Sequence, residues 1–140
     1  MSHPLRDLVQ EAFAPLGVLA RATDHFSPRQ GQTDMALAVA DVVAHGGSLV
    51  VEAGTGVGKT FAYLVPALLS GERVLLSTAT KALQDQLFAR DLPRLVQALN
   101  LPIRLALLKG RSSYLCTHRM EMARRDTQIP DQIGRASCRE

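Results

Sequence analysis

The sequence predicts an α/β fold in which helices flank a parallel sheet, and three observations support this prediction. Short apolar, β-branched runs occur at residues 48–52, 73–77 and 103–107. They alternate with longer stretches whose apolar residues recur at helical spacing. A glycine-rich segment directly follows the first run. Strands and helices in this order are typical of a parallel sheet with right-handed crossovers.

Two helices are expected before the first strand. One begins near Ser2 and ends before Pro15, and the other begins at Ser27, which can cap it, and ends at Gly46. Their apolar faces are expected to consist of Leu5, Leu8, Val9 and Phe13 in the first helix and of Met35, Val39, Val42 and Val43 in the second.

Three further helices are expected between and after the strands. They cover about residues 58–70, residues 80–90 and a short segment that ends at Asn100. A break is expected near Leu92 and Pro93, because proline interrupts the hydrogen bonding of a helix. The alternation contains no linker or internal repeat that would divide it, so most of the chain is expected to form one domain.

The composition is that of an ordinary globular protein. Of 140 residues, 46% are apolar and 21% are charged. A net charge of +3 is compatible with a phosphate-bearing partner but is weak support for one. Two cysteines, Cys116 and Cys138, form neither a disulfide framework nor a local metal motif, and no apolar run is long enough to span a bilayer. We therefore expect a cytoplasmic protein without a signal peptide or membrane span.

The glycine-rich segment matches a P-loop with alanine in its first position. It consists of Ala53, Gly54, Thr55, Gly56, Val57, Gly58, Lys59 and Thr60. Its place after a strand and before a helix is the one that phosphate binding requires. The glycines allow successive N–H groups to point inward, and the helix that follows adds the positive end of its dipole. A simple glycine-rich turn is the alternative, which the full pattern in this context disfavours.

Two side chains of the P-loop are candidate catalytic residues. Lys59 is expected to bind the β- and γ-phosphates of ATP as a mobile point charge. The Thr60 hydroxyl is expected to bind a Mg²⁺ ion that retains most of its waters. The sequence therefore predicts ATP and Mg²⁺ as ligands.

Upstream of the P-loop, residues 26–32 read Phe-Ser-Pro-Arg-Gln-Gly-Gln. This segment resembles the adenine-reading segment of superfamily 2 helicases. The resemblance implies that Phe26 stacks on the base, that Gln32 pairs with its edge, and that Arg29 belongs to the nucleotide site. A side-chain amide offers the donor and the acceptor that this edge of adenine needs. Taken alone, the segment would also fit a capped helix start with a buried Phe26.

A second segment, residues 77–87, resembles motif Ia of the same helicases, which touches the backbone of single-stranded DNA. By this resemblance Thr78, Thr80, Lys81 and Gln84 are candidate DNA contacts. Such groups bind phosphates without reading bases, which allows movement along any sequence. The same residues also predict a helix capped by Thr80 with Leu83 and Leu87 in the core, and both interpretations can hold together.

A third segment, residues 108–116, resembles the entry to the iron-sulfur domain of the DinG and XPD helicases, in particular the bacterial DinG/YoaA branch. The resemblance implies that Cys116 is one of four thiolate ligands of a [4Fe-4S] cluster and that Lys109 and Arg111 face DNA. One thiolate cannot hold a cluster, so ligation concerns a longer protein. His118 lies beside Arg119 in a polar stretch and is expected to be solvated rather than to bind metal.

Residues 1–130 resemble this family, but parts of a helicase motor are missing. The sequence contains no DEAH-like acidic box, second motor lobe or further cluster cysteines, so hydrolysis by this chain alone is expected to be negligible. Residues 1–115 are expected to form the N-terminal part of a RecA-like ATP-binding domain, and residues 116–132 the start of an iron-sulfur domain. Residues 133–140 back-translate, with one choice of codons, to a common sequencing adapter. We interpret them as a non-native tail, so Cys138 is not expected to be a second ligand of the cluster.

The resemblance implies the front part of a 5′-to-3′ ATP-dependent DNA helicase that acts on single-stranded or forked DNA, in DNA repair or replication stress. Two alternatives remain. One is a different P-loop enzyme such as a small-molecule kinase, which would need an arginine-rich lid and an acceptor pocket. The other is that the chain is not an enzyme, and is either a binding module for nucleotide or an incomplete fold whose exposed sheet edges favour aggregation.

Overall fold

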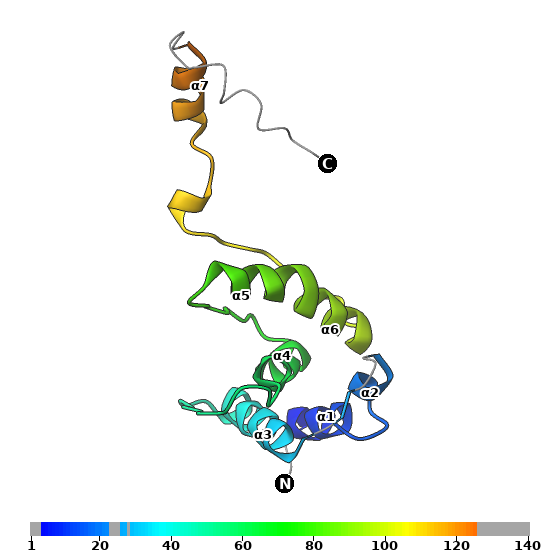
Figure 1. Ribbon diagram of the computed structural model, residues 1–140. Helices are drawn as coiled ribbons and strands as arrows, with labels where there is room; N and C mark the ends of the chain where they lie inside the picture. The colour runs from blue at the N-terminus through cyan, green and yellow to red at the C-terminus, as the bar shows by residue number, and fades with distance from the viewer. Residues whose placement is uncertain (1–3, 23–25, 28, 126–140) are drawn as a thin grey trace. The chain divides into compact units, whose positions relative to one another are not determined.

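The computed structural model describes residues 4–22, 26, 27 and 29–125 as helices joined by extended segments (Figure 1). The chain forms two compact units, Met1–Leu105 and Ala106–Glu140. The first unit contains α1 (Pro4–Ala12), α2 (Val18–Ala22), α3 (Gln30–His45), α4 (Lys59–Leu69), α5 (Lys81–Gln86), the π-helical turn η1 (Leu87–Asp91) and α6 (Leu92–Leu99). The second contains the 3₁₀ turn η2 (Arg111–Ser113) and α7 (Thr117–Arg125).

The core of the first unit lies where α3 and α4 pack against each other, and α1 packs against both. From α4 it takes Leu64 and Val65, both fully buried, and from α3 it takes Ala36 and Ala40. Small side chains at these positions allow two helices to approach closely. The core therefore fixes the spacing of the two helices whose first residues lie at the P-loop.

The predicted apolar face of α3 is confirmed only in part, because Met35 packs against the core but the fully buried stripe lies one residue away from the predicted one. Ala36 and Ala40 are buried, whereas Val43 is 39% exposed. Helical spacing alone does not show which of two adjacent stripes touches the neighbouring helix, and here the stripe of small residues does. In α1 the expected face is largely confirmed, with Leu5 and Val9 buried and Leu8 48% exposed, and Phe13, directly after the helix, is buried as well.

The break predicted near Leu92 and Pro93 is also wrong, because the chain stays helical from Lys81 to Leu99. Pro93 lies in the first turn of α6, where a missing N–H costs little. The π-helical turn η1 comes directly before it and changes the hydrogen-bonding register there. The expected end at Asn100 is confirmed, with a left-handed backbone (φ 50°).

The predicted parallel sheet is not confirmed. Within the described residues none of the segments 48–52, 73–77 and 103–107 forms a strand, and no hydrogen bond joins their backbones. Val50 and Leu75 are 98% and 89% exposed. A β-branched run needs a neighbouring strand to complete its hydrogen bonds, and local preference does not supply one. Only Ile103 and Leu105 of the third segment pack against the core.

In the second unit none of the described residues is fully buried. The hydroxyl oxygen of Tyr114 accepts a hydrogen bond from the backbone N–H of Lys109 at 2.8 Å, which closes the turn around η2. The domain boundary expected at residues 115 and 116 stays a prediction, and the tail expected at residues 133–140 lies outside the described residues. Among the described helices none has the length and apolar character needed to cross a bilayer.

The core predicts a clear difference between two leucines. We expect Leu64→Ala to lower the free energy of unfolding by about 2–5 kcal/mol, because a fully buried side chain is replaced by a cavity. Leu16→Ala, at a position that is 87% exposed, should change it by less than about 0.5 kcal/mol. Urea denaturation followed by circular dichroism measures both, and equal losses would contradict this position of the core.

Candidate nucleotide site

The segment before α4 owes its shape to two of its three glycines. Gly56 and Gly58 have φ angles of 80° and 86°, in the left-handed region that side chains disfavour. Gly58 is also the residue from which α4 begins. Gly54 has no positive φ, and a Cβ there would meet nothing within 4 Å. The predicted need for glycine is therefore strongest at residues 56 and 58.

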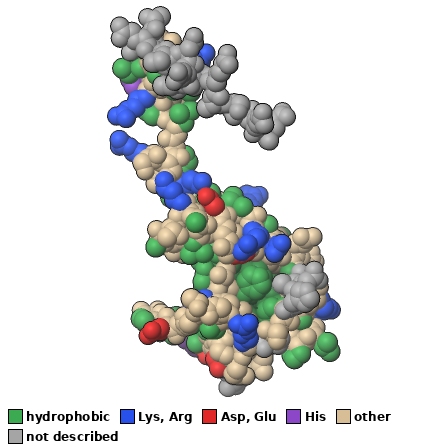
Figure 2. Space-filling view, viewed as in Figure 1, with side chains coloured by type: hydrophobic (Ala, Val, Ile, Leu, Met, Phe, Trp, Pro, Cys, Tyr) green, Lys and Arg blue, Asp and Glu red, His purple; other side chains and the backbone are tan. Residues whose placement is uncertain are grey.

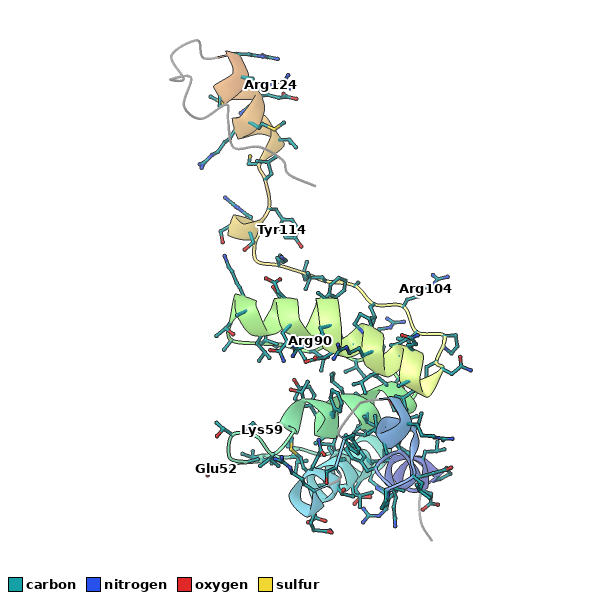
Figure 3. All side chains as sticks on the ribbon, turned by 45° about the vertical axis from the view of Figure 1, so that its right-hand side comes forward. Glu52, Lys59, Arg90, Arg104, Tyr114 and Arg124 are labelled. Carbon is teal, nitrogen blue, oxygen red and sulfur yellow. The ribbon has the colours of Figure 1, made fainter. Side chains whose placement is uncertain are left out.

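Lys59 is folded back into the loop. Its Nζ donates hydrogen bonds to the carbonyl oxygens of Ala53 and Gly54, both at 2.7 Å. Figure 3 shows Lys59 at the start of α4, beside the loop. A phosphate that binds Lys59 must compete with these two carbonyls. The loop thus holds the ammonium group against its own backbone, and binding of phosphate by Lys59 stays a prediction.

The segment upstream of the P-loop holds it from the side of α3. The Nε2 of Gln32 donates to the carbonyl of Gly58 at 3.0 Å, and the guanidinium of Arg29 donates to the carbonyl of Gly56. Gln32 is buried, and its amide nitrogen keeps a second N–H for a ligand. Two residues predicted to contact the nucleotide therefore also support the loop.

Phe26, the predicted stacking residue, packs against Phe13. The ring centroids are 6.2 Å apart and the planes are tilted by 52°, a usual arrangement for an aromatic pair. Phe26 is half-buried. Its contact with the buried Phe13, directly after α1, leaves part of the Phe26 ring at the surface.

A pocket of about 400 Å³ joins these parts. In Figure 2 basic side chains flank an apolar patch on the face of the first unit that is in view. The pocket is lined by Phe26, Ser27, Arg29, Gln32, Gly56, Val57, Gly58, Thr60, Phe61, Gln86, Arg90, Asp91 and Arg94. It brings the upstream segment together with the P-loop, as the resemblance implied. Ala53, Gly54, Thr55 and Lys59 do not line it.

The sequence analysis did not single out four of the residues that line the pocket, namely Gln86, Arg90, Asp91 and Arg94. They come from the end of α5, η1 and α6. A carboxylate among leucines at Asp91, with arginines one residue before it and three after it, was the only available signal. Such charges are usually solvated on a helix, so the pattern did not separate them from an ordinary surface.

Asp91 is a buried carboxylate, 6% exposed, and both of its oxygens are hydrogen bonded. Oδ2 accepts from Gln86 Nε2 at 3.0 Å, and Oδ1 accepts from Arg90 Nε at 2.9 Å. Burial raises the pKa of Tyr63, a hydrogen bond with Thr60 lowers it, and the charge of Asp91 raises it further. The carboxylate of Asp91 therefore lies near Tyr63, whose side chain is hydrogen bonded to Thr60.

The sequence matches the DEAD/DEAH box helicase family over residues 33–129. The chain belongs to this family. It is 53% identical over 122 residues to the ATP-dependent DNA helicase YoaA of Escherichia coli (strain K12), which covers 86% of this chain and 19% of that protein. It is also 53% identical over 100 residues to the ATP-dependent helicase DinG of Mycobacterium tuberculosis (strain ATCC 25618 / H37Rv). This match covers 66% of this chain and 15% of that protein.

Another relative is the 3′-5′ exonuclease DinG of Bacillus subtilis (strain 168), 38% identical over 100 residues, covering 69% of this chain and 11% of that protein. The chain thus spans about a fifth or less of the length of these relatives. No solved structure matches it. The resemblance to the DinG and YoaA helicases is confirmed, and the family implies a P-loop NTPase fold.

In this helicase-family chain the motif Ia-like segment forms the start of α5. The Thr80 Oγ1 accepts a hydrogen bond from the N–H of Leu83 at 3.3 Å, which confirms the predicted cap. Thr78 Oγ1 donates to the carbonyl of Thr80 at 3.4 Å. Leu87 is buried as expected, whereas Leu83 is 36% exposed. Lys81 is exposed and Gln84 is half-buried, and contact of these residues with DNA stays a prediction.

The candidate residues of the second unit lie around η2. Arg111 begins this turn and is exposed, and Lys109 is half-buried. Cys116 is an exposed free thiol, and His118 is exposed as expected. No group of three or more His, Cys, Asp or Glu side chains in the described part of the chain is placed to hold a metal ion. Cys138 lies outside the described residues.

The geometry at Gly58 predicts that the loop glycines differ in importance. A Cβ at Gly58 would collide with the carboxamide of Gln32, with Cδ only 2.9 Å away, and would sit on a left-handed backbone. We expect Gly58→Ala to lower the free energy of unfolding by about 1–3 kcal/mol, and Gly54→Ala to change it by less than about 0.5 kcal/mol. Chemical denaturation of both variants measures this.

A double variant separates the two costs at Gly58. Adding Gln32→Ala should relieve the collision and leave the backbone strain, so the destabilisation caused by Gly58→Ala should be smaller in that background. An equal destabilisation in both backgrounds would show that Gln32 does not occupy this space.

Proposed function

We propose that this chain is the ATP-binding front part of the first RecA-like motor domain of an ATP-dependent DNA helicase. The observation that carries the proposal is the P-loop geometry: two left-handed glycines lead into α4, and Lys59 and Thr60 occupy its first turn. The names of the YoaA and DinG relatives, which are ATP-dependent helicases, support it. The proposal includes the parallel sheet that such a domain contains.

In this site the chain's own groups suffice to bind a triphosphate with Mg²⁺. The N–H groups at the start of α4 point toward the loop with the positive end of the helix dipole, which favours an anion. Lys59 would exchange its two carbonyl partners for phosphate oxygens, and the Thr60 hydroxyl would help to hold Mg²⁺. The metal would neutralise charge on the phosphates. Phe26 and Gln32 hold the base.

Binding without hydrolysis is the activity proposed for these 140 residues. They contain no DEAH-like acidic box to orient the attacking water. In the longer protein, hydrolysis would be coupled to 5′-to-3′ unwinding of single-stranded or forked DNA, in the cytoplasm. Closure around ATP would then change the grip of residues 78–84 on the strand.

The cluster proposal concerns the longer protein only. Cys116 is exposed and supplies one thiolate, whereas a [4Fe-4S] cluster needs four ligands. The described residues contain no group of three or more candidate ligands, so the cluster is proposed for the longer protein alone. The basic residues Lys109 and Arg111 are proposed to face DNA beside it.

Removing the ammonium group of Lys59 should weaken nucleotide binding. We expect the wild type to bind a fluorescent ATP analogue with Mg²⁺ saturably, and Lys59→Ala to weaken binding more than about tenfold, because the phosphates no longer have this charged donor. Circular dichroism verifies that both chains fold. A folded wild type that does not bind would refute the proposal for this chain.

DNA binding should depend on Lys81. We expect Lys81→Ala to weaken binding of a labelled single-stranded oligonucleotide, and to reduce the slope of log K against log salt by about 0.7, the value for one phosphate that is no longer neutralised. Fluorescence anisotropy at several salt concentrations measures both. Arg73→Ala is the control, since Arg73 is exposed and outside both proposed DNA segments. The same change in the control would rule out a specific role for Lys81.

Helicase and kinase differ in their response to DNA. In a chain extended to the length of the relatives, single-stranded DNA should stimulate ATP hydrolysis, because a helicase closes productively only on its strand. A small-molecule kinase would hydrolyse or transfer phosphate equally well without DNA.

A further inference from the structure

One wall of the nucleotide pocket is formed by arginines outside the P-loop. Arg90 and Arg94 are four residues apart and therefore lie on one face of the helix formed by η1 and α6. Both line the pocket that contains Gly56, Gly58 and Thr60. Figure 3 shows Arg90 on the side of this helix that faces α4. The pocket is thus lined by cations on the side formed by η1 and α6.

Asp91 makes these two arginines different. Its buried carboxylate accepts from Arg90 Nε at 2.9 Å and from Gln86 Nε2 at 3.0 Å, so Arg90 is already paired. A π-helical turn brings residues five apart into reach, as Gln86 and Asp91 are here. In the described part of the chain the guanidinium of Arg94 makes no hydrogen bond or ion pair, and the residue is exposed. Arg94 is therefore the basic group that remains for a ligand.

The packing places Arg94 toward the base end of the pocket. Helix α6 packs against both α2 and α4. Thr60 lies in the first turn of α4, and Asp91 is near it through Tyr63. Arg94 lies about one turn further along the helix, away from Asp91. Phe26, four residues after the end of α2, lines the same pocket.

We propose that Arg94 contacts the base of the bound nucleotide, with its guanidinium against the face of the purine opposite Phe26. The inference rests on the proposed ATP site. A planar cation over an aromatic base is attracted by the electrons of the ring, and guanidinium groups stack on bases in this way. Arg29 is occupied by the carbonyl of Gly56 and Arg90 by Asp91, so neither competes for the base.

The test separates the base from the phosphates. Binding of MgATP and of magnesium tripolyphosphate to the full chain is measured by titration calorimetry for the wild type, Arg94→Ala, Arg94→Lys and Lys59→Ala. Arg94→Ala should weaken MgATP binding about five- to thirtyfold, the usual range for a desolvated cation–π contact, and leave tripolyphosphate within about twofold. Arg94→Lys keeps the charge without the plane, so it should lose most of the same affinity.

Arg104→Ala is the matched control, since Arg104 is an exposed arginine outside the pocket and should leave both affinities unchanged. The inference is overturned if Arg94→Ala binds MgATP as the wild type does, or if it loses affinity for MgATP and tripolyphosphate equally. If Lys59→Ala still weakens binding of both ligands more than about tenfold in that case, the proposed function stands and only the role of Arg94 fails. A folded wild type that binds neither ligand overturns both.

Discussion

The left-handed backbone of Gly58 is the constraint on which the rest of the site depends. With φ at 86°, this residue turns the chain from the loop into α4, and its missing side chain leaves the space that the carboxamide of Gln32 occupies. The hydrogen bond from Gln32 to the carbonyl of Gly58 is possible only because that space is empty. One glycine therefore sets the direction of the helix dipole and also joins α3 to the phosphate loop.

The core transmits this arrangement along α3 and α4. Ala36 and Ala40 on one helix pack close to Leu64 and Val65 on the other, so the two axes are held at a fixed separation. The start of α3 then lies beside the start of α4. The upstream segment reaches the P-loop because of apolar packing two turns away, and a cavity in that core would loosen the loop as well as the fold.

What the sequence predicted was local, and what it missed depends on contacts between distant segments. The P-loop is encoded by eight consecutive residues, and the Thr80 cap by residues three apart, so both could be predicted. The role of Asp91 depends on burial under neighbouring helices, which no periodicity shows. The stripe of alanines on α3 was missed because its partner helix, not its own hydrophobicity, selects the buried face. The strands failed for a related reason, since a strand exists only with its neighbour.

The P-loop is supported by the segment before α3 and by the start of α3, and not by the apolar segments 48–52 and 73–77. Val50 and Leu75 lie in solvent, and no strand in the described part of the chain supports the start of the loop. Its shape is held instead by Gln32, by Arg29 and by the two hydrogen bonds of Lys59 to its own carbonyls. In the proposed ATP site an incoming phosphate would replace hydrogen bonds that Lys59 already makes, so the net gain from this lysine would be smaller than its bonds to phosphate alone suggest. The proposed site would then draw the rest of its affinity from the helix N-terminus, Mg²⁺ and the base, and among the pocket residues of η1 and α6 it is Arg94 that is proposed to contribute to base binding.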